Sequence, residues 1–274
     1  MRVAVVQINS TSDRDRNLET ADRLVRAAAA DGAEFVVLPE KWPLLAAGED
    51  QAAASQPIDG PAMTAAAGWA RECGIGLQAG SFTESGADGE MPTNTAVMFS
   101  PDGEVSATYR KIHMFDVDVE GVEYRESSFE AAGDQITHVS AGEAEVGMTI
   151  CYDLRFPELF RALLDEGADT FTVPSAFTAK TGRDHWEPLL RSRAIENQSF
   201  VLGADQVGHA TPELKSWGHS MIVDPWGQVL AGVDEGEGFA AADLDYDRLA
   251  GTRASLPAVE HRRPGLFRDR EGHA

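Results

Sequence analysis

The stretch VGMTICYDLRFPE, residues 146–158, constrains the fold of this chain most, because an apolar run ends in a cysteine shortly before a proline. The run Val146–Ile150 is apolar or small throughout, as expected of a strand covered on both faces. Pro157 suits the first turn of a helix, where its missing N–H costs no hydrogen bond, and apolar residues recur after it at helical spacing. The pattern predicts a strand that carries the Cys151 thiol to the start of a helix.

A cysteine at such a turn can act as a nucleophile. Backbone N–H groups near the turn can lower the pKa of the thiol and bind an oxyanion. Free cysteine is also common core material, so this stretch alone fits a buried structural Cys151 equally well. Cys73, the other cysteine, lies between a predicted helix and a predicted strand with no matching acid or base, and we interpret it as structural. Two cysteines argue against a disulfide framework and against a cysteine-rich metal site.

The rest of the chain alternates predicted strands and helices with no break in composition that would mark a domain boundary. Strands are predicted at 2–8, 35–38, 75–79, 93–99, 105–109, 135–139, 143–150, 170–173, 200–204, 220–223 and 229–231. Helices are predicted around 18–28 and at 61–73, 157–166 and 185–197. We therefore expect one α/β domain over residues 1–256 and a basic tail over 257–274. The tail fits a segment packed on the body or on a second subunit, and equally a partly ordered terminus.

Charge and hydropathy limit the partners of the chain. Its net charge of −22 disfavours nucleic acid and anionic membranes. No apolar run approaches the roughly 20 residues of a membrane span, and the N-terminus lacks a signal-peptide layout, so we expect a cytoplasmic protein. Only four of its 23 basic residues are lysines, against 45 acids. This balance indicates adaptation to high salt, with a biased genome composition as the alternative.

Three polar residues end predicted strands, where α/β proteins place reactive groups. Glu40 ends FVVLPE, Lys111 follows VSATYR, and Cys151 ends VGMTI. Each alone fits a solvated strand end. Together they supply a base for a thiol and an ammonium that stabilises the oxyanion formed at a carbonyl. No G-x-S-x-G elbow and no H-E-x-x-H pair occurs, which argues against a serine hydrolase of that type and against a zinc hydrolase.

At these residues the chain resembles the nitrilase, or carbon–nitrogen hydrolase, superfamily over about residues 2–269. The resemblance rests on the segments VVLPEKW, YRKIHMFD, CYDLRFPEL, PSAFTAKTGRDHWEPLLRSRAIENQ and GHSMIVDPWGQV. It implies a four-layer α-β-β-α sandwich in which Glu40, Lys111 and Cys151 form a catalytic triad. It also implies that Glu126 completes the site. The alternative for Glu126 is an exposed loop acid like its neighbours Glu120, Glu123 and Glu130.

The residues after Cys151 indicate which branch of the superfamily the chain resembles. Tyr152-Asp153 stands where true nitrilases usually have Trp-Glu, which favours amide over nitrile hydrolysis. The chain is most similar to the omega-amidase and deaminated-glutathione-amidase branch. This resemblance implies cleavage of a small linear carboxamide by a homodimer, without metal or organic cofactor, with the Tyr152 N–H on the oxyanion. The alternatives are an N-carbamoyl amino-acid hydrolase and a non-catalytic binding protein on the same fold.

The remaining residues of interest carry two interpretations each. Phe177 either forms a wall of the pocket or packs in the core. His113, beside Lys111, either lines the pocket or positions the strand end. We expect Asp153 and Arg155 to share an ion-pair network that shapes the nucleophile turn, rather than Arg155 to contact substrate. The physiological substrate and the pathway are left open by the sequence.

Overall fold

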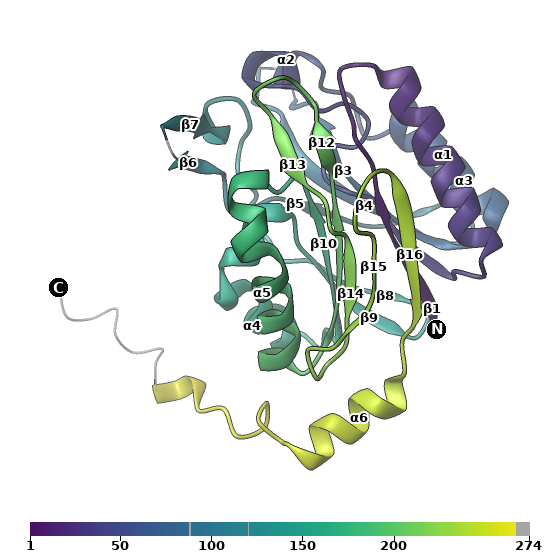
Figure 1. Cartoon of the computed structure of the whole chain (residues 1–274), viewed down its shortest axis with the longest axis vertical. Coiled ribbons are helices and arrows are strands. Elements are labelled where there is room, and N and C mark those ends of the chain that lie inside the picture. The colour runs from purple at the N-terminus through teal and green to yellow at the C-terminus, as the bar shows by residue number, and fades with distance from the viewer. Residues whose placement is uncertain (88, 120, 267–274) are drawn as a thin grey trace.

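Two six-stranded sheets stack face to face, with helices on both outer faces (Figure 1). This computed structural model describes residues 1–87, 89–119 and 121–266. The strand orders are β16-β1-β2-β3-β4-β5 in the first sheet and β15-β14-β11-β10-β9-β8 in the second. The predicted α-β-β-α sandwich is therefore confirmed.

The first sheet is built mainly from the N-terminal part of the chain. Its strands are β1 (Arg2–Gln7), β2 (Phe35–Val37), β3 (Gly76–Glu84), β4 (Thr93–Phe99), β5 (Val105–Arg110) and β16 (Gly238–Asp243). The strands β1, β2 and β3 are parallel, while β4, β5 and β16 pair antiparallel. The helices α1 (Arg14–Ala30) and α3 (Pro61–Cys73) cover its outer face, and the short α2 (Gly48–Ala53) lies at its upper end in Figure 1.

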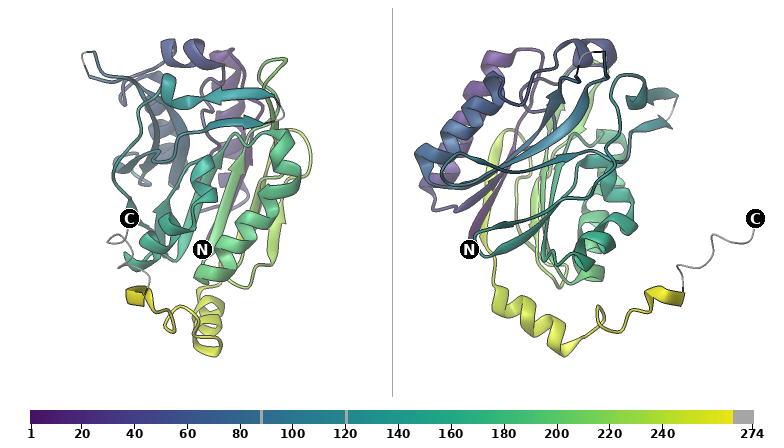
Figure 2. Two further views of the ribbon diagram at one scale, coloured as in Figure 1. Left: turned by 90° about the vertical axis from the view of Figure 1, so that its left-hand side faces the viewer. Right: turned by 180° about the vertical axis from the view of Figure 1, so that it is seen from behind.

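The second sheet carries the cysteine turn. Its strands are β8 (His138–Ala141), β9 (Ala144–Met148), β10 (Thr170–Ser175), β11 (Phe200–Asp205), β14 (Met221–Val223) and β15 (Val229–Gly232). The strands β9, β10 and β11 are parallel. The helices α4 (Pro157–Asp165) and α5 (Ala179–Asn197) cover this sheet from outside. The carboxyl ends of its parallel strands thus open toward the same end of the sandwich as those of β1, β2 and β3 (Figure 2).

Burial on both faces explains the apolar runs. Along β1, Val3 and Val5 face one hydrophobic cluster, whereas Ala4 and Val6 face the other. The period of two is what a pleated strand requires when it lies between two packed layers. Full burial of each such valine contributes roughly 1.5–3 kcal/mol.

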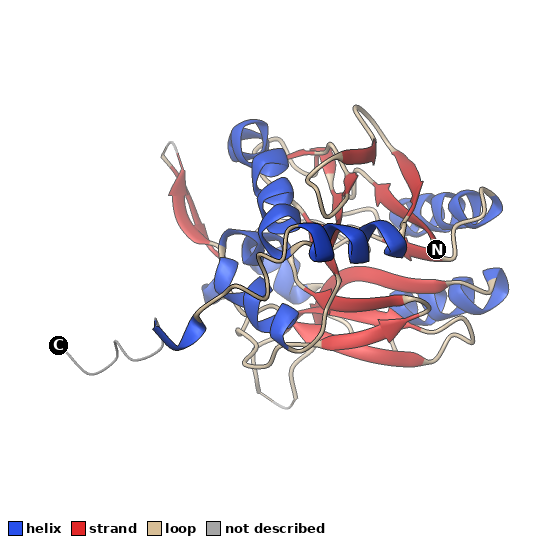
Figure 3. Ribbon diagram, turned by 90° about the horizontal axis from the view of Figure 1, so that it is seen from below, coloured by secondary structure: helices blue, strands red, loops and turns tan. Residues whose placement is uncertain are grey.

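Several elements were not predicted. They are the hairpin of β6 (Asp116–Val119) and β7 (Val122–Arg125), the hairpin of β12 (Val207–His209) and β13 (Lys215–Trp217), the helices α2 and α6 (Tyr246–Ser255), the strand β16, and the 3-10 turns η1 (Glu126–Ser128) and η3 (Pro264–Leu266). The β6–β7 hairpin stands out from the body in Figure 1 and in the right-hand view of Figure 2. The helix α6 crosses the lower end of the sandwich (Figure 3). These elements are short or irregular and carry weak periodicity.

Some predicted boundaries were wrong. The helix predicted from His185 begins at Ala179, because the Thr178 side chain caps its first turn. The strands predicted at 135–139 and 143–150 are the shorter β8 and β9. Between β9 and α4, the polar segment after the strand forms a 3-10 turn, η2 (Cys151–Arg155).

Part of the predicted tail contacts the body. Val259 packs against the larger hydrophobic cluster, and Arg262 forms an ion pair with Asp165 of α4. Residues 267–274, the end of the predicted tail, lie outside the described residues. The boundary at 256 and any packing of the tail on a second subunit stay predictions. Within the described ranges, no helix combines the length and apolarity needed to cross a membrane.

Candidate active site

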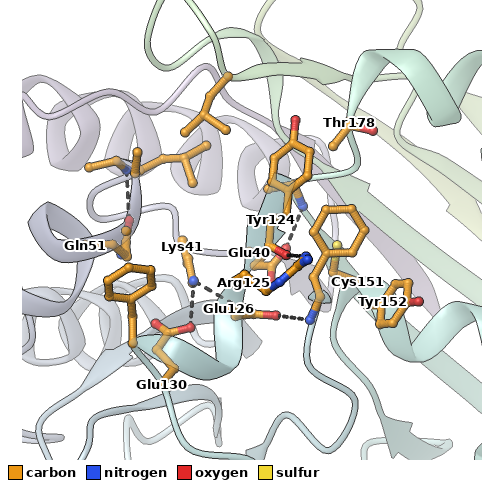
Figure 4. Close-up of a pocket in the computed structure, with 18 of the residues that line it drawn as sticks. Glu40, Lys41, Gln51, Tyr124, Arg125, Glu126, Glu130, Cys151, Tyr152 and Thr178 are labelled. Atoms are coloured by element: carbon orange, nitrogen blue, oxygen red, sulfur yellow. Dashed lines mark hydrogen bonds and ion pairs between the residues drawn. The ribbon is translucent and has the colours of Figure 1, made fainter. Parts of the chain in front are cut away.

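The three predicted strand-end residues meet at one pocket. Its volume is about 440 Å³. The predicted site residues that line it are Glu40, Lys111, Glu126, Cys151, Tyr152 and Phe177. Figure 4 shows the side chains of Glu40, Lys41, Glu126, Glu130 and Cys151 gathered around the pocket from segments far apart in the sequence. The carboxyl ends of β2 and β9 deliver Glu40 and Cys151, and the edge strand β5 delivers Lys111.

Cys151 sits on a strained turn. Its φ of 48° places it in the left-handed region, which costs a residue with a side chain about 1–3 kcal/mol. The turn is fastened by Asp153, whose carboxylate accepts a hydrogen bond from the N–H of Ile150 at 2.9 Å. Burial, and then the Glu40 carboxylate, raise the pKa of the Cys151 thiol, whereas the Lys111 ammonium lowers it. The thiol therefore needs a neighbouring base to react near neutral pH.

Glu40 is buried, and three donors hold its carboxylate in the site. One carboxylate oxygen accepts from the Nδ2 of Asn94 at 2.8 Å and from the Nζ of Lys111 at 3.1 Å. The other accepts from the backbone N–H of Ala176 at 2.8 Å. These contacts fix the carboxylate beside the Cys151 thiol (Figure 4). Its position is that of a base for the thiol proton.

Lys111 bridges two carboxylates and is only 2% exposed. Its Nζ donates to Glu40 at 3.1 Å and to both oxygens of Glu126 at 2.8 and 3.0 Å. Burial alone would lower the pKa of this ammonium, but Glu126 and Glu40 raise it well above its usual value. Lys111 thus stays protonated and offers a fixed positive charge beside the thiol.

Glu126 lines the pocket and is not an exposed loop acid. It begins η1, and its side chain is 11% exposed. Besides Lys111, it accepts a hydrogen bond from the N–H of Phe115 at 2.7 Å. Burial would raise the pKa of its carboxyl, but the ammonium groups of Lys111 and Lys41 hold it well below its usual range. Its catalytic role stays a prediction.

Sequence reasoning missed Lys41 and Glu130. Glu130, grouped there with exposed loop acids, is buried and forms a 2.8 Å ion pair with Lys41. Glu123 is exposed at the pocket rim, and Glu120 lies outside the described residues. A lysine directly after the candidate base, in a chain with four lysines, was the available signal for this pair.

The expected ion pair between Asp153 and Arg155 is not formed. Asp153 is fully buried and accepts hydrogen bonds from Tyr109, His113 and Ile150. Those partners leave no room on its oxygens for Arg155, which turns into the pocket instead. The Arg155 guanidinium lies 5.0 Å from the centre of the Phe177 ring. Among the described residues, no carboxylate pairs with it.

The positions of Phe177 and His113 show which of their two interpretations holds for each. Phe177 does both things at once, because it lines the pocket and packs on Trp186 at a ring distance of 5.2 Å. His113 is not a lining residue. Its ring stacks on Phe156 at 3.6 Å, and its Nδ1 lies 2.7 Å from Asp153, so it braces the segment after Lys111.

The three acids nearest the thiol and the lysines, Glu40, Glu126 and Glu130, contact ammonium groups and are not arranged to hold a metal. In the part of the chain that the structure describes, no three His, Cys, Asp or Glu side chains gather as metal ligands. The pocket carboxylates are instead engaged by the ammonium groups of Lys41 and Lys111. What the described site offers is a thiol, a base and a fixed cation around one cavity.

The chain has known relatives. The sequence pattern that defines the carbon-nitrogen hydrolase family matches residues 2–254. The chain belongs to the carbon–nitrogen hydrolase family. It is 42% identical to the deaminated glutathione amidase of Bos taurus over 97% of this chain and 83% of that protein. The predicted family and enzyme class are therefore confirmed.

Solved structures of the family agree in fold. The NitFhit protein of C. elegans matches with a TM-score of 0.89 and 36% identity, over 97% of this chain and 66% of that one. An amidase from Nesterenkonia sp. AN1 matches with a TM-score of 0.83 and 26% identity, over 98% and 95%. In that structure, of a glutamate-to-glutamine mutant, the acetamide moiety of fluoroacetamide is covalently added to the active-site cysteine.

Proposed function

We propose that this carbon–nitrogen hydrolase cleaves a small linear carboxamide to a carboxylic acid and ammonia through a thioester on Cys151. The observation that carries the proposal is the meeting of Glu40, Lys111 and Cys151 at one pocket. The relatives support it, because a deaminated glutathione amidase and an amidase with a reactive cysteine share this fold over nearly the whole chain.

The first half of the reaction forms the thioester. Glu40 takes the proton of the Cys151 thiol as the sulfur attacks the amide carbon. The carbonyl oxygen gains negative charge, which Lys111 and the Tyr152 N–H stabilise. The tetrahedral species collapses, the carbon–nitrogen bond breaks, and Glu40 returns the proton to the leaving ammonia.

The second half releases the acid. Water enters the place of ammonia, and Glu40, assisted by Glu126, removes a proton from it as its oxygen attacks the thioester carbon. The carbon–sulfur bond breaks, the acid leaves, and the proton returns to the Cys151 sulfur. Every step uses side chains of this chain and water alone.

Arg155 indicates the kind of amide. Its guanidinium is half-buried beside the thiol and has no carboxylate partner among the described residues, while burial lowers its pKa. A half-buried cation without a counter-charge is costly, and a carboxylate on the substrate would supply one. We therefore expect an amide that carries a carboxylate at its other end.

The test is ammonia release by the purified protein in molar salt, with Cys151→Ala as the matched control. The panel holds α-ketoglutaramate, a deaminated γ-glutamyl peptide, an N-carbamoyl amino acid and a plain aliphatic amide. We expect cysteine-dependent release from a carboxylate-bearing amide, together with a thioester mass on the quenched protein. Carbon dioxide released beside ammonia would identify an N-carbamoyl hydrolase instead. Release that survives Cys151→Ala, or silence with every amide, would contradict the proposal.

We infer further that the protein is a homodimer. Three large apolar side chains are exposed around the end of α5: Ile195 at 51%, Trp226 at 60% and Leu256 at 52%. They are neighbours, since Gly227 lies against Ile195 and the Gln198 side chain donates a hydrogen bond to the carbonyl of Leu256. Such a patch suits a symmetric interface. Light scattering in molar salt tests this, and a monomer would contradict it. The cytoplasmic location stays a prediction from the sequence.

A further inference from the structure

Lys41 follows Glu40 directly, but the two side chains bond different partners. The φ of Lys41 is 51°, a left-handed conformation, and its N–H donates to the hydroxyl of Ser81 at 3.1 Å. The Glu40 carboxylate accepts a hydrogen bond from Lys111, whereas the Lys41 ammonium donates one to Glu130. Figure 4 shows Lys41 pointing toward Glu130 and Glu126. A side chain in a strained backbone conformation is often one whose direction matters.

The Lys41 ammonium lies between two carboxylates. Its Nζ is 2.8 Å from an oxygen of Glu130 and 3.5 Å from an oxygen of Glu126. Glu126 in turn lies between two ammonium groups, because Lys111 contacts its oxygens at 2.8 and 3.0 Å. The four side chains form one alternating row of charges that ends at the candidate triad.

The charges in this row do not balance once Glu40 is counted. Among the described residues, three carboxylates, Glu40, Glu126 and Glu130, pair with two ammonium groups, those of Lys41 and Lys111. Burial raises the pKa of the Glu130 carboxyl, whereas the two lysines hold the pKa of Glu126 well below its usual range. The arrangement thus favours the ionised form at Glu126 over the same form at Glu130.

Glu130 is held in place by a chain of hydrogen bonds that leads to the lining of the pocket. Its second oxygen accepts a hydrogen bond from the hydroxyl of Thr83 at 2.8 Å, and that hydroxyl accepts from the Nε2 of Gln51 at 2.9 Å. The Gln51 side chain also accepts from the N–H of Ala46 at 2.8 Å, a residue that lines the pocket. The row of charges is therefore anchored at both ends and has little freedom to turn away from Glu126.

We propose that Lys41, held by Glu130, is a positioning residue that keeps Glu126 ionised and turned toward Lys111. The measurement of turnover that tests this rests on the proposed function. A purely structural role of Lys41 can be distinguished from this positioning role. In that case Lys41 serves only to neutralise the buried charge of Glu130, and removing both charges together restores the site.

The decisive variants are Lys41→Met and the double variant Lys41→Met with Glu130→Gln, in the full chain. The side-chain amide that Glu130→Gln introduces can still accept a hydrogen bond from Thr83. The double variant therefore keeps its fold even where Lys41→Met alone leaves Glu130 unpaired. The matched control is Lys215→Met, which removes an ammonium from an exposed position at the start of β13. Thermal unfolding of each variant checks that it is folded.

Two readouts are measured on each variant. The first is kcat and KM for ammonia release from the best amide of the panel. The second is the titration of the Glu126 carboxyl by ¹³C NMR, assigned by its loss in Glu126→Gln. The charged groups that face Glu126 are Lys111 at the end of β5, Lys41 and Glu40 after β2, and Glu130 beyond η1.

In both Lys41 variants we expect kcat to fall about tenfold with little change in KM. We also expect the pKa of Glu126 to rise by about one unit or more, since one of its two cations is gone. Wild-type kcat and an unchanged Glu126 titration in the double variant would overturn the proposal. If the wild-type protein turns over no amide, the proposed function fails, and the NMR titration still decides the relation between Lys41 and Glu126.

Discussion

The carboxylate of Asp153 accepts a hydrogen bond from the hydroxyl of Tyr109 at 2.7 Å, across 44 residues of sequence. Tyr109 belongs to β5 of the first sheet, and Asp153 to the turn after β9 of the second. Each lies two residues from a member of the candidate triad, Lys111 or Cys151. The bond therefore sets the spacing between the ammonium and the thiol.

Asp153→Asn is expected to lower both stability and turnover. The amide cannot accept from Tyr109, His113 and Ile150 at once, and a buried polar group left without a partner costs about 1–3 kcal/mol. We expect the free energy of unfolding in urea to fall by that amount, and kcat to fall with KM nearly unchanged. Asp102→Asn, in an exposed turn, is the control. Full activity in a destabilised Asp153→Asn protein would show that the bond serves the fold alone.

Glu40→Gln is expected to separate thiol reactivity from turnover. Burial first, and the Glu40 carboxylate second, raise the pKa of Cys151, so removal of that carboxylate lowers it. The pH midpoint of alkylation by iodoacetamide, followed by intact mass, then shifts to lower pH, because more thiolate is present at a given pH. Turnover falls by about 10²–10⁴-fold, since no base remains. The Cys151→Ala variant is the control, because any alkylation that it shows occurs at Cys73. An alkylation midpoint that stays or rises would rule out Glu40 as the group that raises the thiol pKa.

Arg155→Met is expected to weaken recognition of the carboxylate selectively. Loss of a charge-assisted bond to a half-buried guanidinium lowers kcat/KM for a carboxylate-bearing amide by about 10–100-fold. A neutral amide of the same length should be affected little. Arg125→Met is the control, because Arg125 lines the same pocket but already pairs with Glu123 at 2.6 Å. Equal losses on charged and neutral amides would assign Arg155 to packing on Phe177.

The acidic surface leads to a prediction about salt. With a net charge of −22, repulsion between carboxylates opposes the folded state, and added salt screens it. We expect the thermal midpoint to rise by several degrees between about 0.1 M and about 2 M potassium chloride. Sucrose at matched osmolality is the control for general preferential exclusion. A flat midpoint would favour biased genome composition as the origin of the acids.

The site interactions that the sequence did not reveal join charged or polar side chains that are far apart in the sequence. Lys41 and Glu130 are 89 residues apart, and Asp153 meets Tyr109 from another sheet. The local sequence around a charged loop residue does not show whether its side chain is solvated or buried against a partner. The Asp153–Arg155 interpretation failed for this reason, since nearness in sequence says little about which of several buried donors a carboxylate will meet.

The sequence by itself predicted one α/β domain with polar residues at the ends of buried strands, and its family resemblance implied the four-layer sandwich and the candidate triad. Strands such as β1 and β9 carry period-two or continuous apolar patterns, because they are buried locally on both faces, and Glu40, Lys111 and Cys151 stand where such runs stop. Only the tertiary structure decided that Glu130 is buried and Glu126 largely so, that Arg155 faces the pocket without a carboxylate partner among the described residues, and that His113 does not line it. Those facts depend on distances between segments that the two sheets bring together, and no local pattern encodes such distances.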